Sequence, residues 1–325
     1  MAHGTRGMNW GRRATILVPY LWLLCFFLAP FLIVLKISIS EPAIARPPYV
    51  PVWDSPGDAI QHLADPPLDN YEFVRPSIGC LEGTLVGRLV EAVAELPPPE
   101  TDCLYTDSYL TSVGIAAVST LIALAIGYPM AYGIARAAPA WRGLLLTLVI
   151  LPFWTSFLIR VYAWIGILKP EGLLNGFLLW LGLIDQPLNI YLTPTAVHIG
   201  IVYSYLPFMV MPLYASLEKL DEALLEAAAD LGARPFTTFR RVTLPLSLPG
   251  IVAGCFLVFI PAVGEFVIPE LLGGASTQTI GRTLWAEFFQ NRDWPLASAV
   301  AVLLLLILVV PILIFQRFAK REGAG

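Results

Sequence analysis

Long uncharged runs recur along this chain and restrict what it can fold into. Ala14 to Leu35 is a run of 22 residues without a charged side chain. As a helix that rises 1.5 Å per residue, the run is about long enough to cross a hydrocarbon core of roughly 30 Å. Only 14% of the 325 residues are charged, against roughly a quarter in soluble domains. The chain is therefore predicted to lie in a membrane.

Five further apolar runs follow the first. They are Tyr109–Ala135, Gly143–Leu168 with Arg160 inside it, Thr193–Leu217, Leu246–Pro269 with Glu265 inside it, and Pro295–Gln316. Because lipid offers the backbone no hydrogen-bond partner, each run is expected to be a helix. The predicted fold class is an all-α polytopic membrane protein with six transmembrane helices. The stretch Gly172 to Ile184 is too short to span and is expected at the interface, where Trp180 suits the headgroup level.

The first run has an alternative interpretation as a cleaved signal peptide. Arg12 and Arg13 precede it, and Ala43 to Ala45 follow it like a small-residue cleavage site. The run is longer than the apolar region of a signal peptide, which has about 7 to 15 residues. A retained helix is therefore favoured.

Basic residues alternate from loop to loop and give an orientation. They lie before the first run, in every second loop and at the end of the chain: Arg6, Arg12, Arg13, Arg136, Arg142, Arg234, Arg240, Arg241, Arg317, Lys320 and Arg321. With six spans, all of these positions fall on one side. The positive-inside rule makes that side cytoplasmic. The prediction is a multi-pass protein of a bacterial inner membrane with both termini in the cytoplasm.

The loop from Ser38 to Ser108 has the opposite character. It holds twelve carboxylates against three arginines, and it is predicted to be an acidic periplasmic loop. The predicted organisation is the N-terminus and first helix over residues 1–37, this loop over 38–108, the transmembrane domain over 109–318 and a cytoplasmic tail over 319–325. Cys80 and Cys103 share the loop, and a disulfide between them is possible outside the cytoplasm. Sequence alone does not decide the pairing.

The cytoplasmic loop at residues 216–251 carries a helix, a glycine turn and a second helix. Leu217, Leu220, Leu224, Ala228 and Leu231 recur at steps of three or four, which predicts one amphipathic helix. Gly232 suits the position after that helix, and Pro235 suits the first turn of the next. Leu244 and Pro245 are expected to end the second helix. The loop is predicted to be a helical hairpin that covers the permease or docks into another protein.

Several residues of this loop resemble the EAA loop of the permeases of prokaryotic ABC importers. The matching positions are Glu226-Ala227-Ala228, Gly232 and the ending Val242-x-Leu244-Pro245. In that family the two short helices are coupling helices, which fit a groove on the ATPase subunit. The resemblance implies that Glu226 contacts the ATPase and Gly232 allows the turn. The residues that it implies for coupling are Glu226, Ala227, Ala228, Gly232, Arg240, Leu244 and Pro245.

Three further stretches resemble the spermidine/putrescine permeases of this type. They are Leu151 to Trp164, which contains PFWTSFLIRVYAW, Gly172 to Ile184, and Gly264 to Gly274, which reads GEFVIPELLGG. The resemblance covers Tyr109 to Gln316 and leaves out the acidic loop. It implies alternating-access transport of polyamines or related small cations. It also implies a second permease that is usually a different chain, two ATPase subunits and a periplasmic binding protein.

Glu265 is the main candidate for contact with a cation. A carboxylate inside a span is costly unless it is paired or hydrated, so it marks a pathway or a structural ion pair. A polyamine needs carboxylates and aromatic faces to replace its water. The candidate pathway residues are Glu265, Trp154, Tyr162, Trp164 and Tyr203. The alternatives stay open, because Glu265 could pair with Arg160, and Trp164, Trp180 and Trp294 could be interface anchors.

Other function classes find less support in the sequence. The three histidines are scattered, so neither a catalytic triad nor a metal site is predicted. None of the four lysines follows a glycine, so the chain has no phosphate-binding loop. ATP and Mg²⁺ are therefore expected on a partner ATPase, with no cofactor on this chain and no nucleic acid among its partners. An ion-driven secondary transporter and a membrane enzyme with its site in the outer loop are the alternatives.

Overall fold

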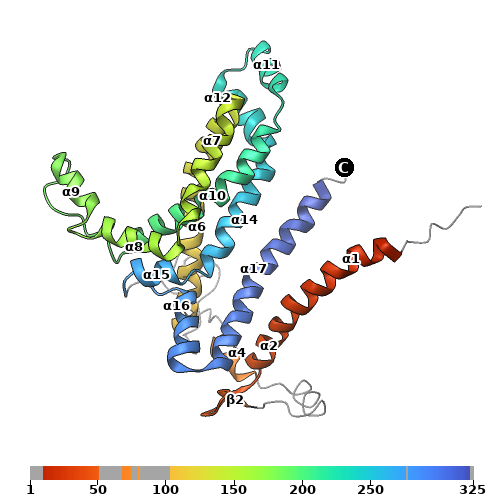
Figure 1. The fold of residues 1–325 in the computed structure, drawn as a ribbon, viewed down its shortest axis with the longest axis vertical. Helices are drawn as coiled ribbons and strands as arrows, with labels where there is room; N and C mark the ends of the chain where they lie inside the picture. The colour runs from red at the N-terminus through yellow and green to blue at the C-terminus, as the bar shows by residue number, and fades with distance from the viewer. Residues whose placement is uncertain (1–9, 51–67, 75–79, 81–102, 276, 323–325) are drawn as a thin grey trace, which may run out of the picture. The chain divides into compact units, whose positions relative to one another are not determined.

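The apolar runs fold as helices in the computed structural model of the chain (Figure 1). The structure describes residues 10–50, 68–74, 80, 103–275 and 277–322. Within these ranges, the only sheet is a hairpin of the two-residue strands β1 (Glu41–Pro42) and β2 (Tyr49–Val50), which pair antiparallel. The prediction of an all-α class is confirmed. The chain divides into two compact units, residues 1–76 with 284–325, and residues 77–283.

The first unit contains two long helical segments. α1 (Trp10–Leu23), the π-helical turn η1 (Leu24–Leu28) and α2 (Ala29–Ser38) follow one another without a break. Their stretch Leu17–Ser38 is long and apolar enough to cross a bilayer. η5 (Ala286–Asn291) precedes α17 (Trp294–Glu322), whose start is capped by the side chain of Asp293. α17 packs against α2 and against the short helix α4 (Asp69–Val74).

Polar side chains of α4 close the end of α2. The side-chain amide of Asn70 donates to the carbonyls of Ser38 and Ser40, at 3.1 and 2.8 Å. The hydroxyl of Tyr71 lies 2.6 Å from Ser38 Oγ. Burial raises the pKa of Tyr71, so this hydroxyl keeps its proton. A part of the predicted acidic loop is thus fixed to the first helix, while residues 51–67, 75–79 and 81–102 of that loop lie outside the described ranges.

The second unit packs around three long helices. They are α6 (Leu104–Arg136), α10 (Pro194–Glu218) and α14 (Leu248–Val263). Met209, Val210 and Leu213 of α10 are fully buried among Ala131 of α6 and Val258 of α14. Around this core lie α7 (Pro139–Ile150), η3 (Leu151–Trp154), α8 (Phe157–Leu168), α9 (Leu173–Trp180), α11 (Glu222–Asp230), α12 (Pro235–Thr238), η4 (Phe239–Thr243), α13 (Leu244–Leu246), α15 (Val267–Leu272) and α16 (Ile280–Trp285).

α6 is the longest helix of this unit, with 33 residues. Near its start, Ser108 Oγ lies 3.0 Å from Thr283 Oγ1, and Ser112 Oγ accepts a hydrogen bond from the backbone N–H of Ile280 at 2.8 Å. These bonds join the start of α6 to α16. A disulfide joins Cys103, the residue before α6, to Cys80, with the two Cα atoms 5.4 Å apart. The start of α6 is therefore held by both side-chain bonds and a covalent link.

Two of the predicted spans are broken rather than continuous. The prediction of one helix over Gly143–Leu168 is wrong, because the helix that begins at Pro139 ends at Trp154 and the chain bends by 90° into Phe157–Trp180. Thr155 and Ser156 have extended backbones, with ψ angles of 153° and 136°, which interrupt the helical hydrogen bonds. Likewise α14 ends at Val263, so Glu265 lies after a helix end and not inside a helix.

Three described helices are long and apolar enough to cross a bilayer by themselves: Leu17–Ser38, Leu104–Arg136 and Pro194–Glu218. Two bent pairs, Pro139–Trp154 with Phe157–Trp180 and Pro235–Leu246 with Leu248–Val263, bring the number to five if each pair is one span. α17 adds a shorter apolar stretch over Trp294–Val309. The count of six spans stays a prediction.

Candidate functional site

The first candidate region is the helical hairpin between α10 and α14. Asp221 begins α11, because its side chain accepts a hydrogen bond from the backbone N–H of Ala223 at 3.0 Å. Two ion pairs tie this entry to the corner between α6 and α7. Arg136 contacts Glu222 at 3.1 Å, and Arg142 contacts Glu218 at 3.9 Å. The base of the hairpin is thereby connected to a second pair of helices.

The prediction of one apolar helix from Leu217 to Leu231 is wrong. Leu217 belongs to the end of α10, and Leu220 lies in the turn before α11. Both are buried, whereas Leu224 is 47% exposed and Leu231 is 89% exposed. The periodic spacing of these residues extends over two helices, because α10 ends at Glu218 and Asp221 begins α11.

Gly232 provides the turn between the two arms of the hairpin. Its φ angle is +77°, in the left-handed region that favours glycine. The N–H of Gly232 donates to the carbonyl of Ala229 at 2.8 Å, and the N–H of Ala233 donates to the carbonyl of Ala228 at 3.0 Å. These two bonds form a Schellman motif, which satisfies the last carbonyls of α11.

The second arm is longer than predicted. α12, η4 and α13 follow one another from Pro235 to Leu246, and the chain bends by 64° only before Leu248. Pro245 therefore does not stop the helix at its own position. η4 is a π-helical turn in which the N–H of Leu244 bonds to the carbonyl of Phe239, five residues back. The bend falls at Ser247, directly before α14, in which Pro249 is the second residue.

The hairpin is fixed at its base and exposed at its tip. Phe239 packs edge-on against the rings of Tyr128 and Tyr132 on α6, with centroids 5.7 and 6.5 Å apart. At the tip, Leu231 and Phe236 are 89% and 75% exposed. Of the seven residues predicted for coupling, Glu226, Ala227, Gly232, Arg240 and Pro245 are exposed, and Ala228 and Leu244 are partly buried. The structure thus places five of them on an open surface.

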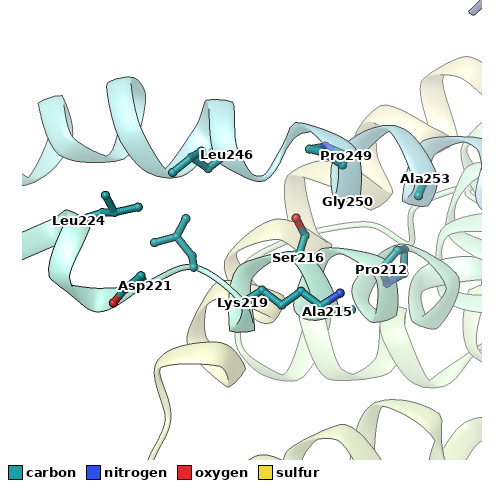
Figure 2. A pocket seen from close by; sticks show the side chains of 11 residues that line it. Pro212, Ala215, Ser216, Lys219, Asp221, Leu224, Leu246, Pro249, Gly250 and Ala253 are labelled. Carbon is teal, nitrogen blue, oxygen red and sulfur yellow. The ribbon is translucent and has the colours of Figure 1, made fainter. Parts of the chain in front are cut away.

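A groove separates the entry arm of the hairpin from the exit arm (Figure 2). It has a volume of about 580 Å³. Leu224 of α11 and Leu246 of α13 face it from the two arms, and Ser216 and Lys219 line it from α10 and the following turn. The remaining lining residues are Pro212, Ala215, Leu220, Asp221, Pro249, Gly250 and Ala253. The arms of the hairpin are therefore not packed tightly against each other along their whole length.

The second candidate region surrounds Glu265 at the break between α14 and α15. Glu265 is buried, with 9% of the residue exposed. Oε1 accepts hydrogen bonds from the backbone N–H groups of Val267 and Ile268, at 3.0 and 3.4 Å, and Oε2 accepts one from the hydroxyl of Tyr205. The side chain of Glu265 thus caps the first N–H groups of α15 and connects this helix to α10. Glu265 and Arg160 are both among the described residues, and they form no ion pair. The structure therefore does not support the alternative that Glu265 pairs with Arg160.

The predicted aromatic residues separate into two groups. Trp154 and Tyr162 are 76% and 59% exposed, on either side of the bend between η3 and α8. Trp164 packs edge-on against Tyr203, with centroids 5.3 Å apart. None of the four bonds to Glu265. The residue that does so is Tyr205, which sequence reasoning missed, although it lies only two positions from Tyr203 and therefore on another face of α10.

The backbone of α16 lies very close to the backbone of the break at Glu265. A Cβ atom placed on Gly281 of α16 would lie 2.7 Å from the carbonyl oxygen of Glu265 and 2.9 Å from that of Gly264. Real Cβ atoms do not come so close to backbone oxygen. Glycine at this position therefore allows α16 to pack directly on the break.

We expect Gly281→Ala to destabilise the protein by about 1–3 kcal/mol, because the backbone must shift to admit the methyl group. The measurement is the midpoint of thermal unfolding of the detergent-purified protein. Gly166→Ala in α8 is the matched control, since a Cβ atom there meets no atom within 4 Å. Equal midpoints for the two variants would contradict the close approach.

The part of the chain that contains these two candidate regions matches a known protein family. The sequence profile described as "Binding-protein-dependent transport system inner membrane component" matches residues 123–321. The chain belongs to this family. The matched residues include the hairpin, both bends and the break at Glu265. The chain is accordingly a membrane-embedded permease and not an enzyme, and the predicted membership is confirmed.

Relatives and a solved structure agree with this assignment. The spermidine/putrescine transport system permease protein PotB of Salmonella typhimurium (strain SL1344) is 49% identical over 219 residues, which cover 67% of this chain and 76% of PotB. PotB of Escherichia coli (strain K12) is 48% identical and is covered to 80%. The permease fold also matches a chain in the crystal structure of a bacterial ABC transporter involved in alginate import, with TM-score 0.63, 18% identity and 96% of each chain covered.

Proposed function

We propose that this permease belongs to an ATP-driven importer of spermidine, putrescine or a related polyamine. The observation that carries the proposal is the identity of 49% with the Salmonella spermidine/putrescine permease PotB. The site adds physical support. Glu265 supplies a carboxylate beside aromatic side chains of α10, and aromatic faces and carboxylates are the groups that can replace the hydration of an ammonium ion.

The proposed assembly contains a second permease that is a different chain, two ATPase subunits and a periplasmic binding protein. ATP and Mg²⁺ would bind to the ATPase subunits. In the proposed topology both termini and the hairpin face the cytoplasm, and the acidic loop over residues 38–108 faces the periplasm. The exposed tip of the hairpin, with Leu231 and Phe236, and the exposed Glu226 of α11 would then enter a groove of the ATPase.

The geometry suggests how force would pass through the permease. The hairpin is bound to α6 and α7 by ion pairs and aromatic contacts and continues directly into α10 and α14. Motion of the docked tip would therefore move several helices together. α14 leads to the break at Glu265, so the same motion reaches the region proposed to receive the cation.

The test is ATP hydrolysis by the complete complex in lipid nanodiscs. Binding protein loaded with spermidine or putrescine should stimulate hydrolysis several-fold over the unloaded binding protein. An amino acid and an oxyanion serve as control ligands. Stimulation by either control, with none by a polyamine, would overturn the proposed substrate class while leaving the family assignment intact.

A further inference from the structure

Arg160 places a positively charged guanidinium in a buried position. It lies on α8, four residues after the bend, and is only 9% exposed. Its Nε and Nη1 atoms are buried and find no acceptor among the residues that the structure describes. A buried charge without a partner is strongly unfavourable. A fixed positive charge at this place therefore requires an explanation.

Aromatic rings surround this guanidinium on both sides of the bend. Its central carbon lies 4.8 Å from the ring centre of Phe153, before the bend, and 5.8 Å from that of Phe157, after it. Aromatic faces attract cations, and they do so more strongly when the cation has lost its water. Arg160 thus occupies a site that is chemically suited to an ammonium group.

A row of rings leads from Arg160 to Glu265. Phe153 packs edge-on against Phe208 at 5.2 Å, Phe208 lies 6.2 Å from Tyr205, and the hydroxyl of Tyr205 bonds to Glu265. We call Phe153, Phe208 and Tyr205 the aromatic row. Phe208 is 40% exposed, so the row can be reached at its centre. One of its ends carries a guanidinium and the other a carboxylate.

The two ends of the aromatic row would act differently on a polyamine. Its methylene segments can lie against ring faces, and its ammonium groups are attracted by the carboxylate end. At the other end, the guanidinium already occupies the face of Phe153 and repels any further ammonium group. Repulsion between charges a few Å apart is strong where water is excluded. A longer polyamine brings more ammonium groups toward that end.

We propose that Arg160 is a specificity-determining residue, which limits how many ammonium groups the aromatic row can receive. The inference rests on the proposed transport of polyamines and adds a selection among them by length and charge. The positive charge of Arg160, rather than the size of its side chain, is the property that discriminates among polyamines. The residue would act by occupying one cation site and by repelling the next cation.

The test measures uptake of a diamine, a triamine and a tetraamine by vesicles that hold the complete complex. We expect Arg160→Gln to raise the ratio of tetraamine to diamine uptake by at least about fivefold. Arg160→Lys keeps the charge and should leave the ratio close to that of the wild type. Ile159→Leu, at an exposed neighbouring position of α8, is the matched control.

The outcomes separate this inference from the proposed function. Wild-type vesicles that take up no polyamine would overturn both. Normal wild-type uptake with an unchanged ratio in Arg160→Gln would overturn the role of Arg160 alone. If Arg160→Gln lowers total uptake through poor assembly, the binding of each labelled amine to purified complex replaces uptake as the measurement. An equal affinity ratio in wild type and variant would then reject the inference.

Discussion

Replacement of Gly232 by valine is expected to reduce uptake at least tenfold while the protein still inserts into the membrane. Gly232 has a φ angle of +77°, and an L-residue in the left-handed region costs roughly 1–2 kcal/mol, more when it is β-branched. Space is not the obstacle, because a Cβ atom at this position meets no atom within 4 Å. Relief of the strain would open the Schellman turn and separate α11 from α12. The tip would then lose the shape that fits the ATPase.

Gly232→Asn is the matched control for this turn, since asparagine tolerates the left-handed region far better than valine does. The measurement compares uptake, ATP hydrolysis and the amount of ATPase that co-purifies with each variant. We expect Gly232→Asn to keep most of the uptake. If Gly232→Val transports normally, the ordered turn is not needed for coupling.

Glu265→Gln is expected to lose most of the uptake and to keep the assembled complex. Glutamine can keep the geometry, because its carbonyl oxygen can accept from Val267 and Ile268 while its amide donates to the hydroxyl of Tyr205. What it removes is the negative charge at the end of the aromatic row. If that charge attracts the cation, transport falls although the fold survives.

Glu265→Ala provides the contrast, because it leaves the N–H groups of Val267 and Ile268 and the hydroxyl of Tyr205 without their acceptor. Each buried group that loses its partner costs about 1–3 kcal/mol. We therefore expect Glu265→Ala to lose assembly as well, judged by co-purification of the ATPase. Full uptake by Glu265→Gln, together with loss of assembly in Glu265→Ala, would show that Glu265 only positions α15.

Composition and spacing predicted the helices well where an apolar run is a single helix. The runs Tyr109–Ala135 and Thr193–Leu217 differ from α6 and α10 by only a few residues at either end. Hydrophobicity did not predict the bends, because an apolar run continues through a bend without any change in composition. Thr155 and Ser156 mark one bend only by their backbone conformation.

The same limit applied to the candidate site. The glycine turn at Gly232 was predicted because a left-handed residue after a helix has a local signal. The partner of Glu265 has no local signal, since Tyr205 lies 60 residues away in sequence. Charge alone suggested Arg160 as the partner. The backbone N–H groups at the start of α15 and one hydroxyl instead satisfy the carboxylate.

The length and attachments of α6 have a consequence for transport. With 33 residues in one uninterrupted helix, α6 extends over about 50 Å. Arg136 at one end bonds to the hairpin, and Ser108 and Ser112 at the other end bond to α16 and its surroundings. A tilt of α6 about its middle would therefore move the hairpin and α16 in opposite directions. Under the proposed topology, the permease would be open to only one side of the membrane at a time. Opening toward one side would close access from the other.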